Sequence, residues 1–418
     1  MASDIPPRYR SATEYCFNEE QVDSIIETVA SPRDDFRLTG ISFPSSEHDN
    51  VRQSIATPFL RAPENDVSTG LGNLARLPVE ILHEVLPHMD IGSLFALRQA
   101  NLSSRRAVDS LPQYQRVISH GLDVFCALLR TRIAAHVSLL DFYDVLCTKA
   151  CAVCGHELAE FVSLLAWGRC CFSCLHKGAP EVKVQALVSA RSQFGLTPAD
   201  AGQLRSFKTL PGTYSMDETD DKARTTVVSA HQAEMLSKGW SRPQRQPDPR
   251  QQPPLQQGLY LPSVGSGIRI PTQDAASVEK ARDTRFRFMA ACSLPSYDKR
   301  TGQAEIGVSC AGCCRLAIRE PPVLENATIK WAYEAYERVY SREGLLQHFR
   351  WCRAAQAEWS WLNGVERPVW ATPLPSWRLN GKSTVLKIAV RGRDMAEFLE
   401  GYHQMTAVVS SFSNNGNP

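Results

Sequence analysis

The sequence predicts a mainly α-helical protein. A short helical bundle is followed by helical, irregular modules that zinc holds together, with long disordered arms and a linker. Three observations predict this fold class. Apolar residues recur at spacings of three and four after residue 74, cysteines gather in Cys-x2-Cys pairs, and a proline- and glutamine-rich stretch interrupts the chain. The length of 418 residues is typical of two or three domains.

The composition is that of an ordinary globular protein. Apolar residues make up 43% of the chain and charged residues 22%, and the formal net charge is +2. This balance produces no field strong enough to favour nucleic acid or a membrane surface. The start, MASDIPPRYRSATEYC, lacks the apolar stretch of a secretory signal, and apolar runs such as FVSLLAW are too short to cross a bilayer. We therefore expect a cytoplasmic or nuclear protein, with no membrane partner, in which disulfides are rare.

The N-terminal residues and the helical bundle differ in how regularly their apolar residues are spaced. We expect residues 1–70 to form a flexible arm in which only RSATEYCFNEEQVDSIIETVA has helical spacing. From Leu74 onward, the apolar spacing predicts three short helices. Pro78 lies where a first helical turn tolerates proline, and Asp90 and Ser104 can cap the second and third helices. Because such a small bundle has a small core, we expect its apolar faces to dock on another part of the chain or on a partner.

The rest of the chain is predicted to alternate between folded and extended parts. Residues 119–205 are expected to hold two helices and the first cysteine group. Residues 206–300 are expected to form a linker, richest in proline and glutamine around 240–270. A second Cys/His module with an aromatic helix is predicted over 301–370, and a C-terminal segment with a disordered tail over 371–418.

The first cysteine group has the spacing of a four-cysteine metal site. Two residues separate Cys151 from Cys154, and the same spacing joins Cys171 to Cys174. This spacing lets both thiolates of one tight turn reach a single ion, and two such turns complete the tetrahedron that zinc prefers. Gly155 suits a turn that needs a positive φ. Four protein ligands leave no open position, so we expect structural zinc.

The same cysteines allow other interpretations. Cys170 lies beside Cys171 and can substitute for it, although only Cys171 keeps the two-residue spacing to Cys174. His156 is a further candidate ligand. A thioredoxin-like redox site requires one pair at a helix start in a βαβ unit, and the second pair and the upstream helices argue against it. A third interpretation is that these cysteines are ordinary buried core residues, but two Cys-x2-Cys spacings would then have to arise by chance.

A second, more widely spaced group predicts another zinc site. Cys310 and Cys313 form one pair, and His348 and Cys352 lie four residues apart, on one face of a predicted helix. The segment between the two halves is longer than in a compact finger, and Cys314 is an alternative second cysteine. The two groups together predict one to two structural zinc ions per chain.

We find no motif that indicates catalysis or base recognition. The chain has no glycine-rich phosphate loop, no HExxH and no GxSxG, and the two histidines of HEVLPH have the wrong spacing for a metalloprotease. Base readout requires basic or amide side chains on a helix that projects from the metal knuckle, whereas GHELAEFVSLLAWGRC is apolar and mildly acidic. We therefore expect a protein that is not an enzyme and has no nucleic-acid partner.

The stretch LPVEILHEVLPHMDIGSLFALRQANLSSRRAVDSL, within a predicted domain over 71–118, resembles an F-box. It has a Leu-Pro start, a nearby glutamate, an apolar helix, an Asp-Ile-x-x-Leu turn, the motif Leu-Arg-x-Ala-Asn and a basic, apolar third helix. The chain further resembles F-box proteins of filamentous fungi, which carry a Cys-x2-Cys … Cys-Cys-Phe-x-Cys-Leu segment after the F-box. The resemblance extends over about 74–175 and more loosely over 300–355.

This resemblance implies a substrate-recognition subunit of a cullin-based, SCF-type ubiquitin ligase. An F-box docks on a Skp-type adaptor carried by a cullin scaffold, and the rest of the chain presents a protein substrate. Tethering raises the local concentration of the substrate lysine, so the subunit itself does no bond chemistry. If the roles of the F-box motif positions apply to the matching residues here, the residues that face the adaptor, or order the helices that face it, are Leu77, Pro78, Ile81, Leu82, Ile91, Leu94 and Leu97.

A second function is also compatible with these residues, namely a zinc-dependent interaction or regulatory protein with no link to ubiquitin. In that case residues 120–175 are expected to cover the apolar face around Leu77 and Ile81. An exposed face favours docking of an adaptor instead. The substrate cannot be identified from the sequence. The aromatic residues of the second module are interpreted as core at helical spacing, namely Trp331, Tyr333, Tyr336 and Tyr340.

Overall fold

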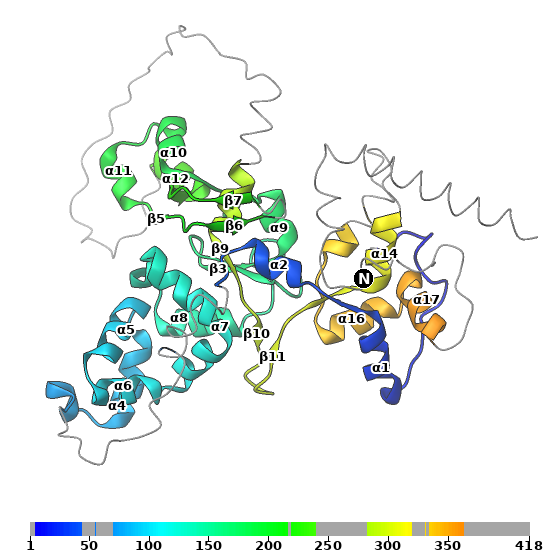
Figure 1. Cartoon of the computed structure of the whole chain (residues 1–418), viewed down its shortest axis with the longest axis horizontal. Coiled ribbons are helices and arrows are strands. Elements are labelled where there is room, and N and C mark those ends of the chain that lie inside the picture. Colours follow the sequence, from blue (N-terminus) through cyan, green and yellow to red (C-terminus); the bar gives the residue numbers. More distant parts are fainter. Residues whose placement is uncertain are drawn as a thin grey trace, which may run out of the picture.

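A computed structural model describes residues 5–43, 55, 70–215, 219–239, 282–319, 331 and 334–362. Among these residues helices predominate, and the strands are only two to four residues long, so the mainly α fold class is confirmed. Figure 1 shows a first helical part at one side, a central part with short strands, and a second helical part at the other side.

The first helical part contains the three short helices that the apolar spacing predicts. They are α4 (Val79–Val85), α5 (Ile91–Ala100) and α6 (Leu102–Asp109). The Asp90 carboxylate caps α5, as predicted, by accepting a hydrogen bond from the Ser93 amide at 2.9 Å. The predicted cap at Ser104 is wrong. The residue directly before α6 is Asn101, whose side chain accepts a hydrogen bond from the Ser104 amide at 2.8 Å.

Two further helices extend this part across the predicted boundary between 71–118 and 119–205. They are α7 (Pro112–Thr131) and α8 (Leu139–Cys147), and the short 3-10 helices η3 (Leu86–His88) and η4 (Ile133–His136) connect the bundle. Ser138 caps α8 as predicted, in a reciprocal capping box with Asp141. Because α7 runs through residue 118, the predicted boundary there is wrong, and the three short helices are continuous with the residues that follow.

The central part combines two antiparallel three-stranded sheets with short helices. One sheet has the strand order β3-β2-β9 and the other β4-β8-β5, and β6 and β7 form a separate pair. The strands are β2 (Phe161–Ser163), β3 (Gly168–Cys170), β4 (Val184–Ala186), β5 (Ser206–Lys208), β6 (Gly212–Tyr214), β7 (Thr219–Asp221), β8 (Thr226–Ser229) and β9 (Ala291–Ser293). The helices are α9 (Phe172–Lys177), η5 (Pro180–Val182), α10 (Leu187–Phe194), α11 (Pro198–Gln203) and α12 (Ala230–Ser237).

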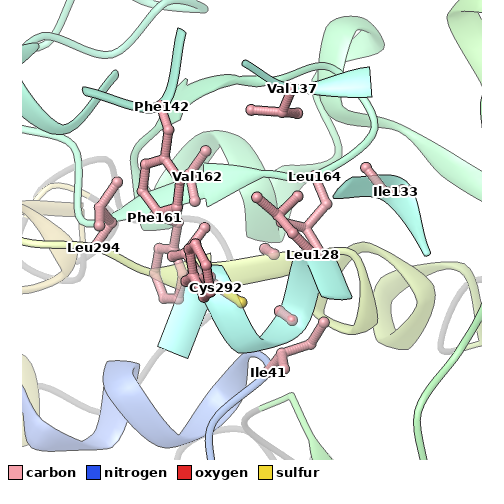
Figure 2. Close-up of a cluster of buried hydrophobic side chains, with 14 of the residues drawn as sticks. Ile41, Leu128, Ile133, Val137, Phe142, Phe161, Val162, Leu164, Cys292 and Leu294 are labelled. Atoms are coloured by element: carbon pink, nitrogen blue, oxygen red, sulfur yellow. The ribbon is translucent and has the colours of Figure 1, made fainter. Parts of the chain in front are cut away.

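One buried apolar cluster joins the first helical part to the central part. Figure 2 shows Leu128 of α7 and Phe142 of α8 in the same cluster as Phe161 of β2, with Leu294 and Ile41 contributed by distant segments. These side chains are 0–3% exposed. Full burial of such a side chain contributes roughly 1.5–3 kcal/mol. The two parts therefore share one core.

The predicted linker over 206–300 is wrong for most of the residues that the structure describes there. Residues 206–239 contribute β5 to β8 and α12, and residues 282–297 contribute a helix, β9 and β10 (Ser296–Tyr297). Strands of two to four residues carry too little alternation to be recognised, which is why the sequence does not indicate them. The proline- and glutamine-rich stretch around 240–270 lies outside the described residues.

The N-terminal residues belong to the fold, so the predicted flexible arm is wrong for residues 5–43. The helix α1 (Glu19–Val29) lies where the apolar spacing predicts it, and it begins with a capping box at Asn18. The strand β1 (Ala30–Pro32) then pairs antiparallel with β12 (Val308–Cys310). A strand so far along the chain cannot be matched to β1 from local sequence, because pairing depends on tertiary contacts.

After β1 the chain enters the central part through α2 (Asp34–Thr39). The ring of Phe36 stacks on Phe172 with 3.9 Å between centroids. The Ile41 amide donates a hydrogen bond to the Ala291 carbonyl at 2.8 Å. The segment from β1 to Ile41 therefore connects the second helical part with the central part.

The second helical part surrounds the second Cys/His group. It consists of α1, β1, β12, α14 (Ala311–Arg319), α16 (Arg342–Phe349) and α17 (Arg353–Leu362). The pair β10 and β11 (Ala304–Glu305) lies between the two helical parts in Figure 1. Ile25 of α1 and Leu345 of α16 are fully buried in its core. The predicted boundary at 301 falls inside the hairpin formed by β10 and β11, which pair on either side of it. The predicted segment 371–418 lies outside the described residues.

The aromatic residues of this part are only partly as expected. Tyr336 and Tyr340 are buried, as core residues should be, and Trp331 is half-buried. Tyr340 does not lie on a helix, because its backbone pairs with Val308 in a β-bridge. Tyr333 lies outside the described residues.

Candidate metal centres and an exposed apolar face

The first candidate metal centre brings together the four predicted ligands Cys151, Cys154, Cys171 and Cys174. Their sulfur atoms all lie within 4.8 Å of one another, and 3.7 Å separates the sulfurs of Cys154 and Cys171. Four thiols at such distances cannot all ionise without a cation, because like charges raise one another's pKa. The arrangement therefore fits one metal ion with four thiolate ligands.

Local structure positions the two pairs. The first pair lies in a tight turn in which the Gly155 amide donates to the Cys151 carbonyl at 2.9 Å, and Gly155 has the predicted positive φ, +69°. The second pair lies at the start of α9, where Cys171 is the cap residue. The Cys171 amide points at the Cys151 sulfur, 3.4 Å away. A backbone donor aimed at a sulfur stabilises its ionised form.

The alternatives near this centre occupy other positions. Cys170 is fully buried and pairs with Phe161 across the β2–β3 ladder. Burial raises the pKa of the Cys170 thiol well above its usual range. The Nε2 atom of His156 lies 3.1 Å from the Val339 carbonyl oxygen. Neither residue belongs to the group of four, in which Cys171 and not Cys170 lies beside the other three sulfurs.

The thiols of the first centre differ in acidity. A hydrogen bond from the Cys171 thiol, together with backbone donors, lowers the pKa of Cys151 to about 4. Burial and neighbouring sulfurs raise the pKa of Cys174 to about 12. Cys151 is thus ready to ionise, whereas Cys174 needs a nearby positive charge to do so, and a bound dication would supply it.

The second candidate centre brings together Cys310, Cys313, His348 and Cys352. Their ligand atoms lie within 4.8 Å of one another, and all four residues are buried. The Cys313 sulfur is 3.3 Å from His348 Nε2 and 3.7 Å from the Cys352 sulfur. Cys314 is not in this group but packs in a separate small cluster. The Cys-Cys-His-Cys set therefore meets as predicted, despite the long segment between its halves.

The ring of His348 is oriented by Tyr340. The Nδ1 atom of His348 lies 3.3 Å from the Tyr340 hydroxyl, and the two rings stack with 4.8 Å between centroids. If Nε2 binds a metal ion, Nδ1 carries the proton and can donate a hydrogen bond to the Tyr340 hydroxyl. Such an outer partner holds a metal-binding imidazole in one tautomer and orientation. The sequence indicates Tyr340 only as a core residue, and no local signal predicts its contact with His348.

Two helix N-termini meet at the second centre. Cys310 directly precedes α14 and Cys352 directly precedes α17, and each sulfur lies 3.4 Å from a backbone amide of the first turn of its helix. Partial positive charge at a helix start favours a thiolate. Gly312 permits this approach, since a Cβ atom at that position would lie 2.4 Å from the Ala354 carbonyl carbon. A cysteine just before a helical pattern is the signal that could have indicated this feature.

The N-terminal segment covers the second centre. The Ser11 amide donates to the Trp351 carbonyl and the Arg353 amide donates to the Tyr9 carbonyl, both at 3.0 Å. These bonds bracket the ligand Cys352 on both sides. Ile25 and β1 pack against the same group. Nothing in the local sequence of residues 5–32 indicates this role, because it depends on contacts more than 270 residues away.

Helix α4 and the residues before it present an exposed apolar face. Of the eight large apolar side chains that are exposed among the described residues, five lie between residues 74 and 85. They are Leu74 (37% exposed), Leu77 (39%), Val79 (57%), Ile81 (40%) and Val85 (51%). We call these five side chains the α4 face. Residues 120–175 do not cover it.

The predicted adaptor residues divide into two groups. Leu77, Pro78 and Ile81 are exposed, and Leu97 is half-buried. Leu82, Ile91 and Leu94 are 0–6% exposed, so a role in direct partner contact is wrong for them. They pack in the core and can only order the helices.

A buried ion pair holds the helices behind the α4 face. The Arg98 guanidinium donates to the Asp109 carboxylate at 2.6 Å, and the Arg98 side chain is 1% exposed. This pair joins α5 to α6. Arg98 belongs to the Leu-Arg-x-Ala-Asn motif, but the sequence analysis did not assign it this role.

Across the described ranges, no helix combines the length and the apolar character needed to span a membrane. Comparison of the chain with protein-family models, with curated proteins and with solved structures found no match. Its function therefore has to be inferred from its residues and their geometry.

Proposed function

We propose that this chain is an F-box substrate-recognition subunit of a cullin-based, SCF-type ubiquitin ligase, as its resemblance implies. The α4 face would dock on a Skp-type adaptor, and the rest of the chain would hold the substrate. The observation that carries this proposal is the exposed α4 face itself. Monomeric proteins rarely expose such a contiguous apolar patch unless a partner covers it.

The sequence explains why α4 exposes this face. Ile81 and Val85 lie four residues apart on one side of α4, whereas Leu82 is buried in the core. Leu77 lies just before the helix and is also exposed. A helix that is apolar on two sides requires two partners. The chain supplies one of them, and Figure 1 shows α4 at the outer edge of the first helical part.

The proposed subunit is not an enzyme. Its contribution is to raise the local concentration of a substrate lysine near a ubiquitin-charged enzyme. The exposure of Leu77 and Ile81 supports this function over the alternative, a zinc-dependent interaction protein unconnected with ubiquitin, which requires that face to be covered within the chain.

We further propose that both candidate centres hold structural zinc. Four cysteines, or three cysteines with one histidine, are donor sets of structural zinc, and four protein ligands leave no position open for a substrate. When bound, the ion would supply folding free energy and neutralise the thiolates, without bond chemistry. None of the described cysteines forms a disulfide, which supports a reducing compartment, and we place the protein in the cytoplasm or nucleus.

The direct test is co-purification of the chain with a Skp-type adaptor. The triple variant Leu77→Ala, Pro78→Ala, Ile81→Ala should weaken adaptor binding roughly 30-fold, because the partly exposed Leu and Ile side chains each contribute roughly 1 kcal/mol on docking. Val188→Ala is the matched control, since Val188 on α10 is 79% exposed and lies outside the face. Failure of the unmodified chain to bind the adaptor, or equal binding by the triple variant, would contradict the proposal.

A further inference from the structure

We propose that the two candidate metal centres are coupled, so that an ion bound at one centre raises the affinity of the other about tenfold. The coupling runs through residues 155–158, which we call the connecting loop. This loop lies between the two cysteine pairs of the first centre and contacts residues 339–344 of the second helical part. The inference rests on the proposed function, because it takes zinc as the ion of both centres. It deepens that function by making the parts that would hold a substrate one zinc-dependent unit.

Backbone hydrogen bonds attach the connecting loop directly to a ligand of the first centre. The Cys151 amide donates to the His156 carbonyl at 2.8 Å, and the Gly155 amide donates to the Cys151 carbonyl at 2.9 Å. The Ala159 amide closes the base of the loop by donating to the Lys149 carbonyl at 2.8 Å. The position of the loop therefore depends on the turn that carries Cys151, which a bound ion would hold in place.

The imidazole of His156 reaches toward the second centre. Its Nε2 atom lies 3.1 Å from the Val339 carbonyl oxygen, and because a carbonyl oxygen only accepts, Nε2 is the donor of this hydrogen bond. The ring also meets the ring of Tyr340 edge to face, with 6.5 Å between centroids and 87° between planes. Tyr340 in turn stacks on the ligand His348. One aromatic side chain therefore separates His156 from a ligand of the second centre.

The carboxylate of Glu157 contacts the start of the helix that carries His348. Ser341 is the cap residue of α16, and its hydroxyl donates to the Glu157 carboxylate at 2.8 Å while it accepts from the Gly344 amide at 3.0 Å. The partial positive charge at a helix start also favours a carboxylate there. Gly344 leaves room for this group, since a Cβ atom at that position would lie 2.8 Å from a Glu157 oxygen. Glu157 therefore helps to fix the helix that positions His348.

Apolar packing completes the contact between the connecting loop and the second helical part. Leu158 is 2% exposed and Val339 is 1% exposed, and both belong to the same buried cluster. Both side chains lie against Gly307, where a Cβ atom would overlap with each of them. Gly307 directly precedes β12, the strand that ends at the ligand Cys310. The contact thus combines a closely packed apolar centre with the two polar contacts of His156 and Glu157.

Such a contact can transmit order from one centre to the other. Ion binding has to order the connecting loop at the first centre and residues 339–344 at the second, and this ordering costs conformational entropy. The first ion to bind orders one surface and, through docking, the other surface as well, so the second ion bears a smaller cost. Reciprocity requires that each ion favours the other by the same factor. Because structural zinc binds tightly, each centre still fills at excess zinc, and the coupling changes affinities without changing the number of ions.

The test is a competition titration of the zinc-free, full-length chain in reducing buffer, with zinc against a chromophoric chelator of known zinc affinity. Cys352→Ser reports the affinity of the first centre alone, and Cys174→Ser that of the second alone. In the unmodified chain, the overall constant for loading both ions should exceed the product of these single constants about tenfold. In a chain that also carries His156→Ala and Glu157→Ala, this ratio should fall to about one. Glu181→Ala is the matched control and should keep the ratio, because Glu181 is an exposed glutamate on η5.

A ratio of about one in the unmodified chain would overturn this inference, and so would a ratio that the double variant leaves unchanged. If the double variant binds fewer than two ions, Glu157→Ala alone replaces it. That single change keeps the imidazole contact and should lower the ratio to about threefold, and an unchanged ratio would again overturn the inference.

The same samples separate this inference from the proposed function. Fewer than two ions in the unmodified chain, by elemental analysis, would remove the zinc assignment and the coupling with it. Two ions with a ratio of about one would overturn the coupling alone. The double variant should bind the adaptor as the unmodified chain does, because it leaves the α4 face intact. If the ratio is as expected but no adaptor binds, the ubiquitin-ligase function fails and the coupling stands.

Discussion

The two candidate metal centres use nearly the same ligands but are built in opposite ways. The first draws all its ligands from residues 151–174, and its ligand Cys154 is exposed. The second draws its ligands from residues 310–352, all of them buried, and is covered by residues 5–32. One centre is therefore mainly local, and the other depends on three distant segments of the chain.

This difference shows what a ligand motif needs from the rest of the fold. One tight turn and the start of α9 suffice to gather the first four sulfurs. The second group also needs Tyr340 to orient its histidine and Gly312 to let α14 approach α17. We therefore expect damage to the first centre to remain local and damage to the second to spread.

Replacement of one ligand in each centre should have the largest effect. Cys174→Ser and Cys352→Ser should each reduce bound zinc from two ions per chain to one, and each loses binding free energy on the order of 10 kcal/mol. Hydrogen exchange should then rise over residues 149–179 in the first variant. In the second it should rise over 334–362 and also over 5–32, because that segment packs on the ligands.

The matched control for these two variants is Cys170→Ala, which removes a buried thiol that lies outside both groups of four. It should keep both ions, as measured by elemental analysis. Two ions retained in Cys174→Ser or Cys352→Ser would contradict the assignment of that centre. If residues 5–32 exchanged hydrogen as slowly in Cys352→Ser as in the unmodified chain, the contrast between a local first centre and a distributed second centre would be contradicted.

Arg33→Met should have the next largest effect, because it cuts the connection between the centres. The Arg33 guanidinium lies between the rings of Phe36 and Tyr336, at 3.4 and 4.3 Å from their centroids, and donates to the Tyr336 carbonyl at 2.8 Å. Its loss leaves the largely buried Asp35 without its ion pair. We expect destabilisation of roughly 2–4 kcal/mol in urea unfolding.

Arg33→Lys is the conservative control for this connection. It keeps the charge beside Asp35 but loses the planar group that stacks between two rings, so its effect should be intermediate. Equal stability of Arg33→Met and the unmodified chain would show that the two parts are held by apolar contacts alone.

Glu160, which lies beside the first centre, should make stability depend on pH. Its carboxylate accepts a hydrogen bond from the Phe172 amide at 2.9 Å, but burial raises the pKa of Glu160 to about 7 from its usual 4.5. Because the folded state holds this proton more tightly, the contribution to stability is complete below about pH 4 and is lost as pH rises through 7. The loss amounts to roughly 3 kcal/mol.

Glu160→Gln removes this titration. The stability of the variant relative to the unmodified chain should rise between pH 5 and 8, as measured by urea unfolding at each pH. The thiols of the centre are common to both proteins, so their titration cancels in the difference. A difference that is constant over this range would rule out the raised pKa.

The smallest effect should come from the surface contact between α9 and the second helical part. Lys177 pairs with Glu334 at 3.2 Å, but the two side chains are 56% and 41% exposed. Solvent screens such a pair, so Lys177→Ala should cost less than about 0.5 kcal/mol in the same unfolding experiment. A loss above about 1 kcal/mol would mean that surface charge, and not Arg33, connects the two parts.

The sequence by itself determined the features that depend on neighbours along the chain. Helix starts at Asp90 and Ser138 follow from side chains that reach amides three residues ahead. The Cys-x2-Cys pairs follow from the reach of one turn, and the positive φ of Gly155 follows from its place after such a pair. The mainly α class follows in the same way from apolar spacing.

Tertiary structure alone decided which of these features face outward and which distant segments meet. Leu77 and Leu82 look alike in sequence, but only Leu82 is covered by the bundle. The strands β1 and β12 carry no recognisable period, and their pairing places residues 5–32 over the second centre. Burial and strand pairing are set by contacts between residues far apart in the chain, and local pattern does not encode those contacts.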